Sequence, residues 1–120
     1  MEEIEERPLT SAEAAALSFV LSGDFPGVEE LQAQAPTARV IGVCGCGCPT
    51  IHLAVDEANT PPALTAVPGV VASVTSRDPR YTHLMVWVEG DHLSSLELSW
   101  IEGPPSEFPP LDHFDPPTPG

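Results

Sequence analysis

The stretch THLMVWVEGDHLSSLELSWI, residues 82–101, carries the pattern that decides the fold. Apolar and polar residues alternate on both sides of a Gly-Asp dipeptide, which is typical of two half-buried strands joined by a turn. A two-residue loop would pair Val86 with Ser95 and leave the apolar residues unmatched. A three-residue loop at residues 90–92 pairs Val86 with Leu96 instead, and the sequence therefore favours this register.

The favoured register gives this hairpin one apolar face and one mixed face. The apolar face collects Leu84, Val86, Val88, Leu96, Leu98 and Trp100. The mixed face carries His83, Met85, Trp87, Glu89, Ser95, Glu97 and Ser99. Here Trp87 and Met85 lie between Glu89 and Glu97, and an aromatic anchor with a polar rim is typical of a protein-binding surface. If helices covered this face, Trp87 would belong to the core, and the sequence leaves both interpretations open.

The rest of the chain predicts an α+β fold. A capping box, Thr10 to Glu13, starts a first helix, and a shorter helix follows over residues 28–35. Strands are expected over residues 38–44, 50–56 and 70–76, in addition to the hairpin. We therefore expect two N-terminal helices followed by an antiparallel sheet of about five strands.

The ends of the chain differ in composition from this predicted domain. Residues 1–8 are acidic and are predicted to form an N-terminal arm. Residues 9–103 are predicted to form a single α+β domain. Residues 104–120 are rich in proline, which removes backbone donors and excludes helices and central strands. We expect this C-terminal segment to be an extended tail.

The charge of the protein excludes several classes of partner. Among 120 residues, 18 are acidic and only 4 are lysine or arginine, a formal net charge of -14. Nucleic-acid binding requires clustered cations, and an anionic membrane surface would repel this chain. The acidic N-terminus is the opposite of a secretory signal, so a cytoplasmic location is predicted. Such a charge suits solubility or the attraction of a cationic protein partner.

The second distinctive stretch is VIGVCGCGCPTIHLAV, residues 40–55, which contains all three cysteines of the chain. A hairpin that pairs Ile41 with Leu53 also places Cys44 opposite Thr50. His52 then lies diagonal to Cys44 on the same face. Three thiols and one imidazole are the ligand set of a tetrahedral zinc site, which makes Cys44, Cys46, Cys48 and His52 the candidate ligands.

Two other interpretations of the cysteines remain open. Cysteine is often buried as a small apolar residue, so the glycine-rich segment can be a tight structural turn with buried thiols. A thiol with a lowered pKa would instead be reactive, as in an enzyme. The chain lacks the serine-hydrolase elbow, the phosphate loop, the H-E-x-x-H zinc motif and the dinucleotide fingerprint. No catalytic residues are therefore predicted.

Three segments together resemble small actinobacterial proteins without an assigned function. They are LTSAEAAAL, DFPGVEELQAQ and RVIGVCGCGCPTIHLAV, which fall within residues 9–57, and C-G-C-G-C-P is the most specific part. The resemblance implies a compact bacterial cytoplasmic protein and transfers no activity.

These observations favour a small acidic binding protein that is not an enzyme and has no cofactor. An inhibitor or immunity protein that masks a basic partner, such as a nuclease toxin, fits the charge. Its predicted partner-binding residues are Met85, Trp87, Glu89 and Glu97. The alternative is a zinc-binding domain that uses the cysteine hairpin, and a third interpretation is an enzyme with a reactive cysteine. The sequence predicts no oligomeric state.

Overall fold

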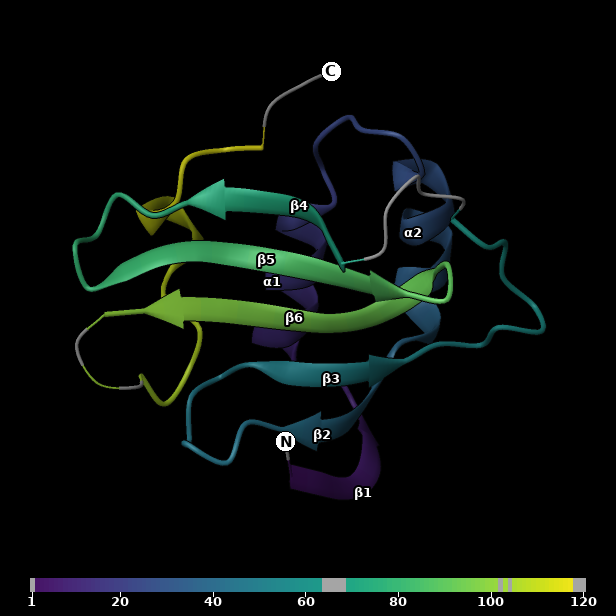
Figure 1. The fold of residues 1–120 in the computed structure, drawn as a ribbon, viewed down its shortest axis with the longest axis horizontal. Helices are drawn as coiled ribbons and strands as arrows, with labels where there is room; N and C mark the ends of the chain where they lie inside the picture. Colours follow the sequence, from purple (N-terminus) through teal and green to yellow (C-terminus); the bar gives the residue numbers. More distant parts are fainter. Residues whose placement is uncertain (1, 64–68, 102, 104, 118–120) are drawn as a thin grey trace.

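The computed structural model describes residues 2–63, 69–101, 103 and 105–117. The elements are β1 (Glu2–Pro8), α1 (Ser11–Val20), α2 (Val28–Gln34), η1 (Ala35–Thr37), β2 (Arg39–Val43), β3 (Ile51–Ala54), β4 (Gly69–Thr75), β5 (Tyr81–Glu89), β6 (His92–Trp100) and η2 (Leu111–His113). The six strands form one sheet in the order β1-β2-β3-β6-β5-β4, and every neighbouring pair is antiparallel (Figure 1).

This arrangement confirms the α+β fold and corrects two of its details. The sheet has six described strands rather than five, and the helices are not N-terminal because β1 precedes them. The sequence predicts an acidic arm over residues 1–8; residue 1 lies outside the described residues, and residues 2–8 form β1, which pairs with β2 at the edge of the sheet. Charged side chains are common on edge strands, where they oppose pairing with a further chain. The acidic composition of this segment is therefore compatible with a strand. Its Ile4 packs against the core.

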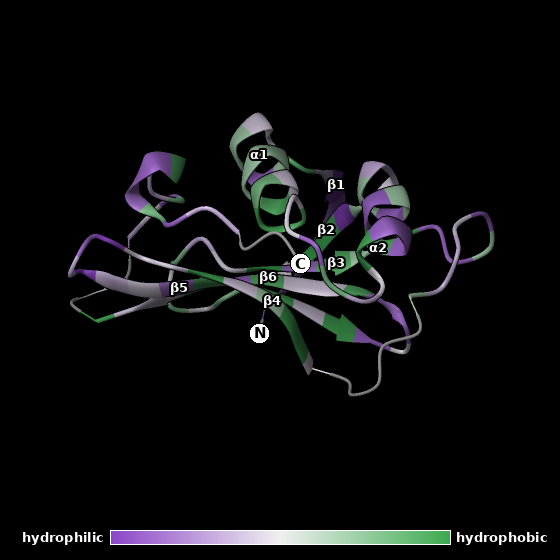
Figure 2. Ribbon diagram, turned by 90° about the horizontal axis from the view of Figure 1, so that it is seen from above, coloured by the Kyte–Doolittle hydropathy of each residue, from purple (hydrophilic) through white to green (hydrophobic). Residues whose placement is uncertain are grey.

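Both α-helices lie over the same face of the sheet (Figure 2). The apolar face of the β5–β6 hairpin points toward them. The buried core combines helix residues and sheet residues, including Ala16, Leu17, Val20, Leu31, Leu84, Val86, Leu96 and Leu98. Over the described residues, Figure 2 shows no helix on the opposite face. Trp87 therefore lies on the face that the helices leave uncovered, where it is half-buried.

The register of the β5–β6 hairpin is the predicted one, but its turn is tighter. Val86 pairs with Leu96, as expected, whereas Glu89 pairs with His92, so the loop has two residues and not three. Gly90 and Asp91 fill it with φ angles of 60° and 64°, the left-handed geometry that matches the twist of a hairpin. A bulge in β6 next to Leu93 then restores the apolar pairing further along.

The first helix begins at the predicted capping box. Thr10 accepts a hydrogen bond from the Glu13 amide at 3.1 Å, and the Glu13 carboxylate accepts one from the Thr10 amide at 2.8 Å. Arg7 of β1 donates to both oxygens of the same carboxylate, at 2.8 and 3.0 Å. Burial opposes the ionisation of Glu13, but the hydrogen bonds from Arg7 and Thr10 outweigh it and lower the pKa of this carboxyl. The contact with Arg7 ties the edge strand to the helix.

A buried amide joins the second helix to the far end of the sheet. Gln34 is fully buried, and its Nε2 donates to the carbonyl oxygens of Pro61 and Asp91 at 2.8 and 3.1 Å. Its Oε1 accepts from the Leu93 amide at 2.9 Å. All of these contacts join segments distant in sequence, so Gln34 fixes α2 against the β5–β6 turn.

The C-terminal segment packs against the domain over residues 105–117, whereas residues 104 and 118–120 of the expected tail lie outside the described residues. Phe114 is only 1% exposed and forms a bridge with Ser76 beside β4. The Arg77 amide donates to the His113 carbonyl at 2.7 Å, and the Asp115 amide donates to the Thr75 carbonyl at 2.9 Å. Proline excludes a regular strand here, yet the buried Phe114, the partly buried Phe108 and Leu111 and a few backbone hydrogen bonds hold the segment.

Candidate metal centre

The cysteines lie in the connection between β2 and β3. Two predicted pairs are present, Val43 with Ile51 and Gly42 with His52. The predicted pair of Ile41 with Leu53 is wrong, because an irregularity in β2 places Val40 opposite Leu53. This bulge shifts the pairing at the end of the hairpin away from the turn, and the pairing next to the turn stays as predicted. The cysteine loop therefore starts from the expected position.

Backbone hydrogen bonds shape the loop itself. The Cys44 amide donates to the Thr50 carbonyl at 3.3 Å, and the Gly47 amide donates to the Cys44 carbonyl at 3.2 Å. Gly47 has a φ of +87°, which glycine adopts without strain. The Thr50 hydroxyl accepts from the Leu98 amide of β6 at 3.1 Å. The loop is thus closed at its base and attached to the central hairpin.

This loop brings all three thiols together. The Sγ atoms of Cys44, Cys46 and Cys48 all lie within 4.8 Å of one another. The Sγ atoms of Cys44 and Cys46 are 2.9 Å apart, and the Cys48 amide donates to the Cys46 sulfur at 3.4 Å. Only Cys48 is buried, since Cys44 is half-buried and Cys46 is exposed. Two of the three thiols are therefore not core residues, which disagrees with a structural turn whose thiols are all buried.

The three thiols differ in acidity. Burial opposes the ionisation of Cys48, but hydrogen bonds with Cys46 and Thr50 outweigh it and lower the pKa of this thiol to about 7. The hydrogen bond between Cys46 and Cys44 favours the protonated form, and it raises the pKa of Cys46 to about 11. A thiolate at Cys48 is thus supported by the neighbouring Cys46 thiol, which keeps its proton.

His52, the fourth predicted ligand, lies outside this cluster. Its donor atoms are not among those within 4.8 Å of one another. His52 instead pairs with Ser95 of β6 and lines an open groove with Trp87 and Glu97. The pairing of β3 with β6 joins strands far apart in the sequence, and hairpin geometry alone does not reveal it.

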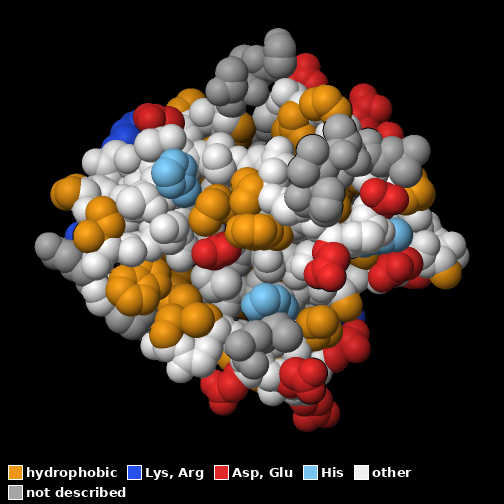
Figure 3. Space-filling model, viewed as in Figure 1, with side chains coloured by type: hydrophobic (Ala, Val, Ile, Leu, Met, Phe, Trp, Pro, Cys, Tyr) orange, Lys and Arg blue, Asp and Glu red, His pale blue; other side chains and the backbone are white. Residues whose placement is uncertain are grey.

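The groove belongs to the uncovered face of the sheet, which carries all four predicted partner-binding residues. Glu89 is exposed, whereas Met85, Trp87 and Glu97 are half-buried. Figure 3 shows hydrophobic side chains gathered over the middle of this face, with acidic and histidine side chains among them. The indole Nε1 of Trp87 is buried and has no hydrogen-bond partner within the described part of the chain.

Three residues of this face are not among the predicted partner-binding residues, although the sequence predicts His52 as a zinc ligand and Ser95 on the mixed face of the hairpin. His52 and Ser95 lie beside Trp87 because β3, β6 and β5 are neighbours. Val70 lies opposite Trp87 on β4 and is 45% exposed. The alternation of β4 predicts only that Val70 shares a face with other residues of that strand, so no local signal places His52 and Val70 beside Trp87.

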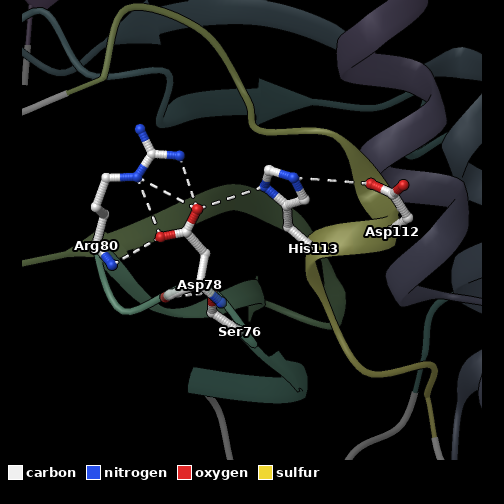
Figure 4. A network of polar contacts seen from close by, with 5 residues as sticks. All are labelled: Ser76, Asp78, Arg80, Asp112 and His113. Carbon is white, nitrogen blue, oxygen red and sulfur yellow. Dashed lines mark hydrogen bonds and ion pairs between the residues drawn. The ribbon is translucent and has the colours of Figure 1, made fainter.

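A network of polar side chains lies at the Tyr81 end of β5, away from the groove. It consists of Ser76, Asp78, Arg80, Asp112 and His113 (Figure 4). Asp78 accepts hydrogen bonds from Arg80 at 2.7 to 3.2 Å, and they lower the pKa of its carboxyl to about 2. His113 Nδ1 lies 3.6 Å from Asp78.

Serine, aspartate and histidine meet in this network, but the serine hydroxyl is already engaged. Ser76 Oγ donates to the Asp78 carbonyl and accepts from the Asp78 amide. It therefore stabilises the β4–β5 turn, and the network holds the C-terminal segment against that turn.

The chain matches no family model, no curated protein and no solved structure. Among the described residues, no helix has both the length and the apolar composition needed to cross a membrane. The thiol cluster and the uncovered sheet face are the two candidate sites of the protein.

Proposed function

We propose that the protein binds a metal ion through Cys44, Cys46 and Cys48. The observation that carries this proposal is the mutual proximity of the three Sγ atoms, all within 4.8 Å of one another. Thiolates are strong ligands for zinc and for other soft metal ions. Because the loop is held by hydrogen bonds of its own, the donors are arranged before a metal arrives.

Zinc is the ion that the sequence predicts, with His52 as the fourth ligand. A structural zinc site uses four protein ligands, whereas the cluster supplies three. In the zinc interpretation, His52 or a water molecule completes the tetrahedron.

Native mass spectrometry tests metal binding directly. The reduced protein is incubated with Zn(II) and, separately and without oxygen, with Cu(I), and each sample is then exchanged into metal-free buffer. We expect the wild type to retain one of these ions and the C44S/C46S/C48S variant to retain neither. Retention of neither ion by the wild type would refute the proposal, as would equal retention by the serine variant. Circular dichroism checks that the variant is folded.

The uncovered sheet face supports a second function, the binding of a cationic protein. Within the described part of the chain the helices cover one face only (Figure 2). On the other face, Met85 pairs with Glu97, and Trp87, Glu89 and Glu97 line one groove. An aromatic ring beside carboxylates is suited to a lysine or arginine side chain, through cation–π attraction and ion pairing. The net charge of -14 would also steer a basic partner toward the protein. An inhibitor or immunity protein for a basic toxin is a protein of this kind.

Two pairs of charge-removing substitutions test this second function. E89Q/E97Q removes two carboxylates from the uncovered face, and E29Q/E30Q removes two from α2 on the other side of the sheet. We measure binding to the basic proteins that the wild type retains at low salt. Loss of retention with E89Q/E97Q alone is expected. An equal effect of both pairs would mean that net charge alone is responsible, and the face would not be the binding site.

A further inference from the structure

The ligand set of the thiol cluster consists of sulfur alone. Among the described residues, no histidine nitrogen or carboxylate oxygen joins the three Sγ atoms within 4.8 Å. His52 is turned toward the groove that also contains Trp87 and Glu97. Glu2 approaches the loop, with its Oε2 3.7 Å from the position that a Cβ on Gly45 would occupy, but it does not join the cluster.

A set of three thiolates discriminates between metal ions. Zn(II) in structural sites completes a tetrahedron of four protein ligands. Cu(I) is a soft, closed-shell ion that selects thiolates, and three of them complete its coordination in a trigonal site. The cluster as it stands therefore satisfies Cu(I), whereas Zn(II) requires a further ligand.

The position of the cluster indicates an ion that can be exchanged. The loop is closed by hydrogen bonds between Cys44 and Thr50 and between Gly47 and Cys44, which involve no metal. Cys46 is exposed, so one of the three ligands is open to solvent. A structural zinc site instead contributes to the folding free energy of the protein that surrounds it. We therefore expect this hairpin to fold without the ion.

We propose that Cys44, Cys46 and Cys48 bind one Cu(I) ion with three thiolate ligands and that the ion exchanges through the exposed side of Cys46. Binding replaces the remaining thiol protons, which pass to solvent, and the oxidation state of copper does not change. A thiolate of a donor or acceptor molecule then displaces one cysteine ligand at a time. This inference rests on the metal-binding function proposed above and specifies its ion.

An anaerobic competition titration tests the proposal. Cu(I), supplied as its acetonitrile complex, is titrated into the reduced protein in the presence of the chelator bathocuproine disulfonate. We expect one Cu(I) per chain, and X-ray absorption at the copper edge should show sulfur as the only first-sphere scatterer. Each of C44S, C46S and C48S should lose this complex. H52A and E2Q should keep the affinity of the wild type, and H83A is a matched control for H52A on the same sheet face.

Two results separate this inference from metal binding in general. If Co(II), used as a probe for Zn(II), gives a tetrahedral spectrum that H52A abolishes, and Cu(I) does not bind one to one, the site is a four-ligand zinc site. Metal binding would then stand and the copper proposal would be overturned. If neither ion binds, both proposals fail. Circular dichroism of the metal-free protein should show the folded spectrum, and loss of that spectrum without metal would overturn the exchangeable site.

Discussion

The substitution of Phe114 by alanine is the sharpest test of how the C-terminal segment is held. Phe114 is 1% exposed and belongs to the hydrophobic core, although it lies among prolines. Removing a buried phenyl ring costs about 3–5 kcal/mol, because the transfer free energy is lost and a cavity remains. A domain is stable by only about 5–15 kcal/mol, so the loss is a large share of the total.

Urea unfolding followed by circular dichroism measures this loss. With a slope of about 2 kcal/mol per molar urea, the midpoint should fall by about 2 M. Phe108 offers a matched control because it is the same residue type in the same segment and is only half-buried. Its substitution by alanine should cost less than about half as much.

The backbone contacts beside Phe114 supply a second readout. The amides of Arg77 and Asp115 donate to carbonyls across the bridge between β4 and this segment. Hydrogen exchange at both amides should accelerate in the alanine variant. A loss below about 1 kcal/mol with an unchanged slope would refute the reasoning, because Phe114 would then not be buried in solution.

Three further predictions each concern one polar side chain. Thr10→Ala removes the helix cap and should lower the free energy of unfolding by about 1 kcal/mol in urea, and no change would contradict the capping role. Gln34→Met removes the partner of the Leu93 amide and of the Pro61 carbonyl, whereas the Asp91 carbonyl keeps the Ala63 amide. It should cost about 3 kcal/mol, measured against Gln32→Met as the exposed control. The Asp78 carboxyl has a pKa of about 2 when folded and 3.8 ordinarily, so its stabilisation is present above pH 3.8 and disappears as the pH falls toward 2. In Asp78→Asn this part of the acid dependence should be absent, and parallel acid curves for variant and wild type would contradict it.

The local features of the fold could be predicted because nearby residues determine them. The capping box of Thr10 and Glu13 is a contact over three residues. The register of Val86 with Leu96 follows from the alternation of apolar residues on either side of one turn. The two-residue loop was missed because a bulge in β6 compensates for it, and the sequence pattern does not distinguish a longer loop from a bulge.

The candidate metal site also has a part that the sequence predicts and a part that it does not. Proximity of Cys44, Cys46 and Cys48 follows from their spacing in one short loop, and the sequence predicts it. The position of His52 depends on the pairing of β3 with β6, two strands that are far apart in the sequence. That pairing places His52 in the groove beside Trp87, outside the cysteine cluster.

By itself, the sequence determined the α+β class, the central hairpin, the acidic charge and the cysteine loop. Each depends on residue type or on neighbours within one turn. The tertiary structure alone decided that β1 joins the sheet, that Phe114 is core and that Trp87 lies on the uncovered face. The physical reason is that these outcomes depend on which distant surfaces bury each other. Several pairings of amphipathic strands satisfy the same local pattern, and only packing of the whole chain selects among them.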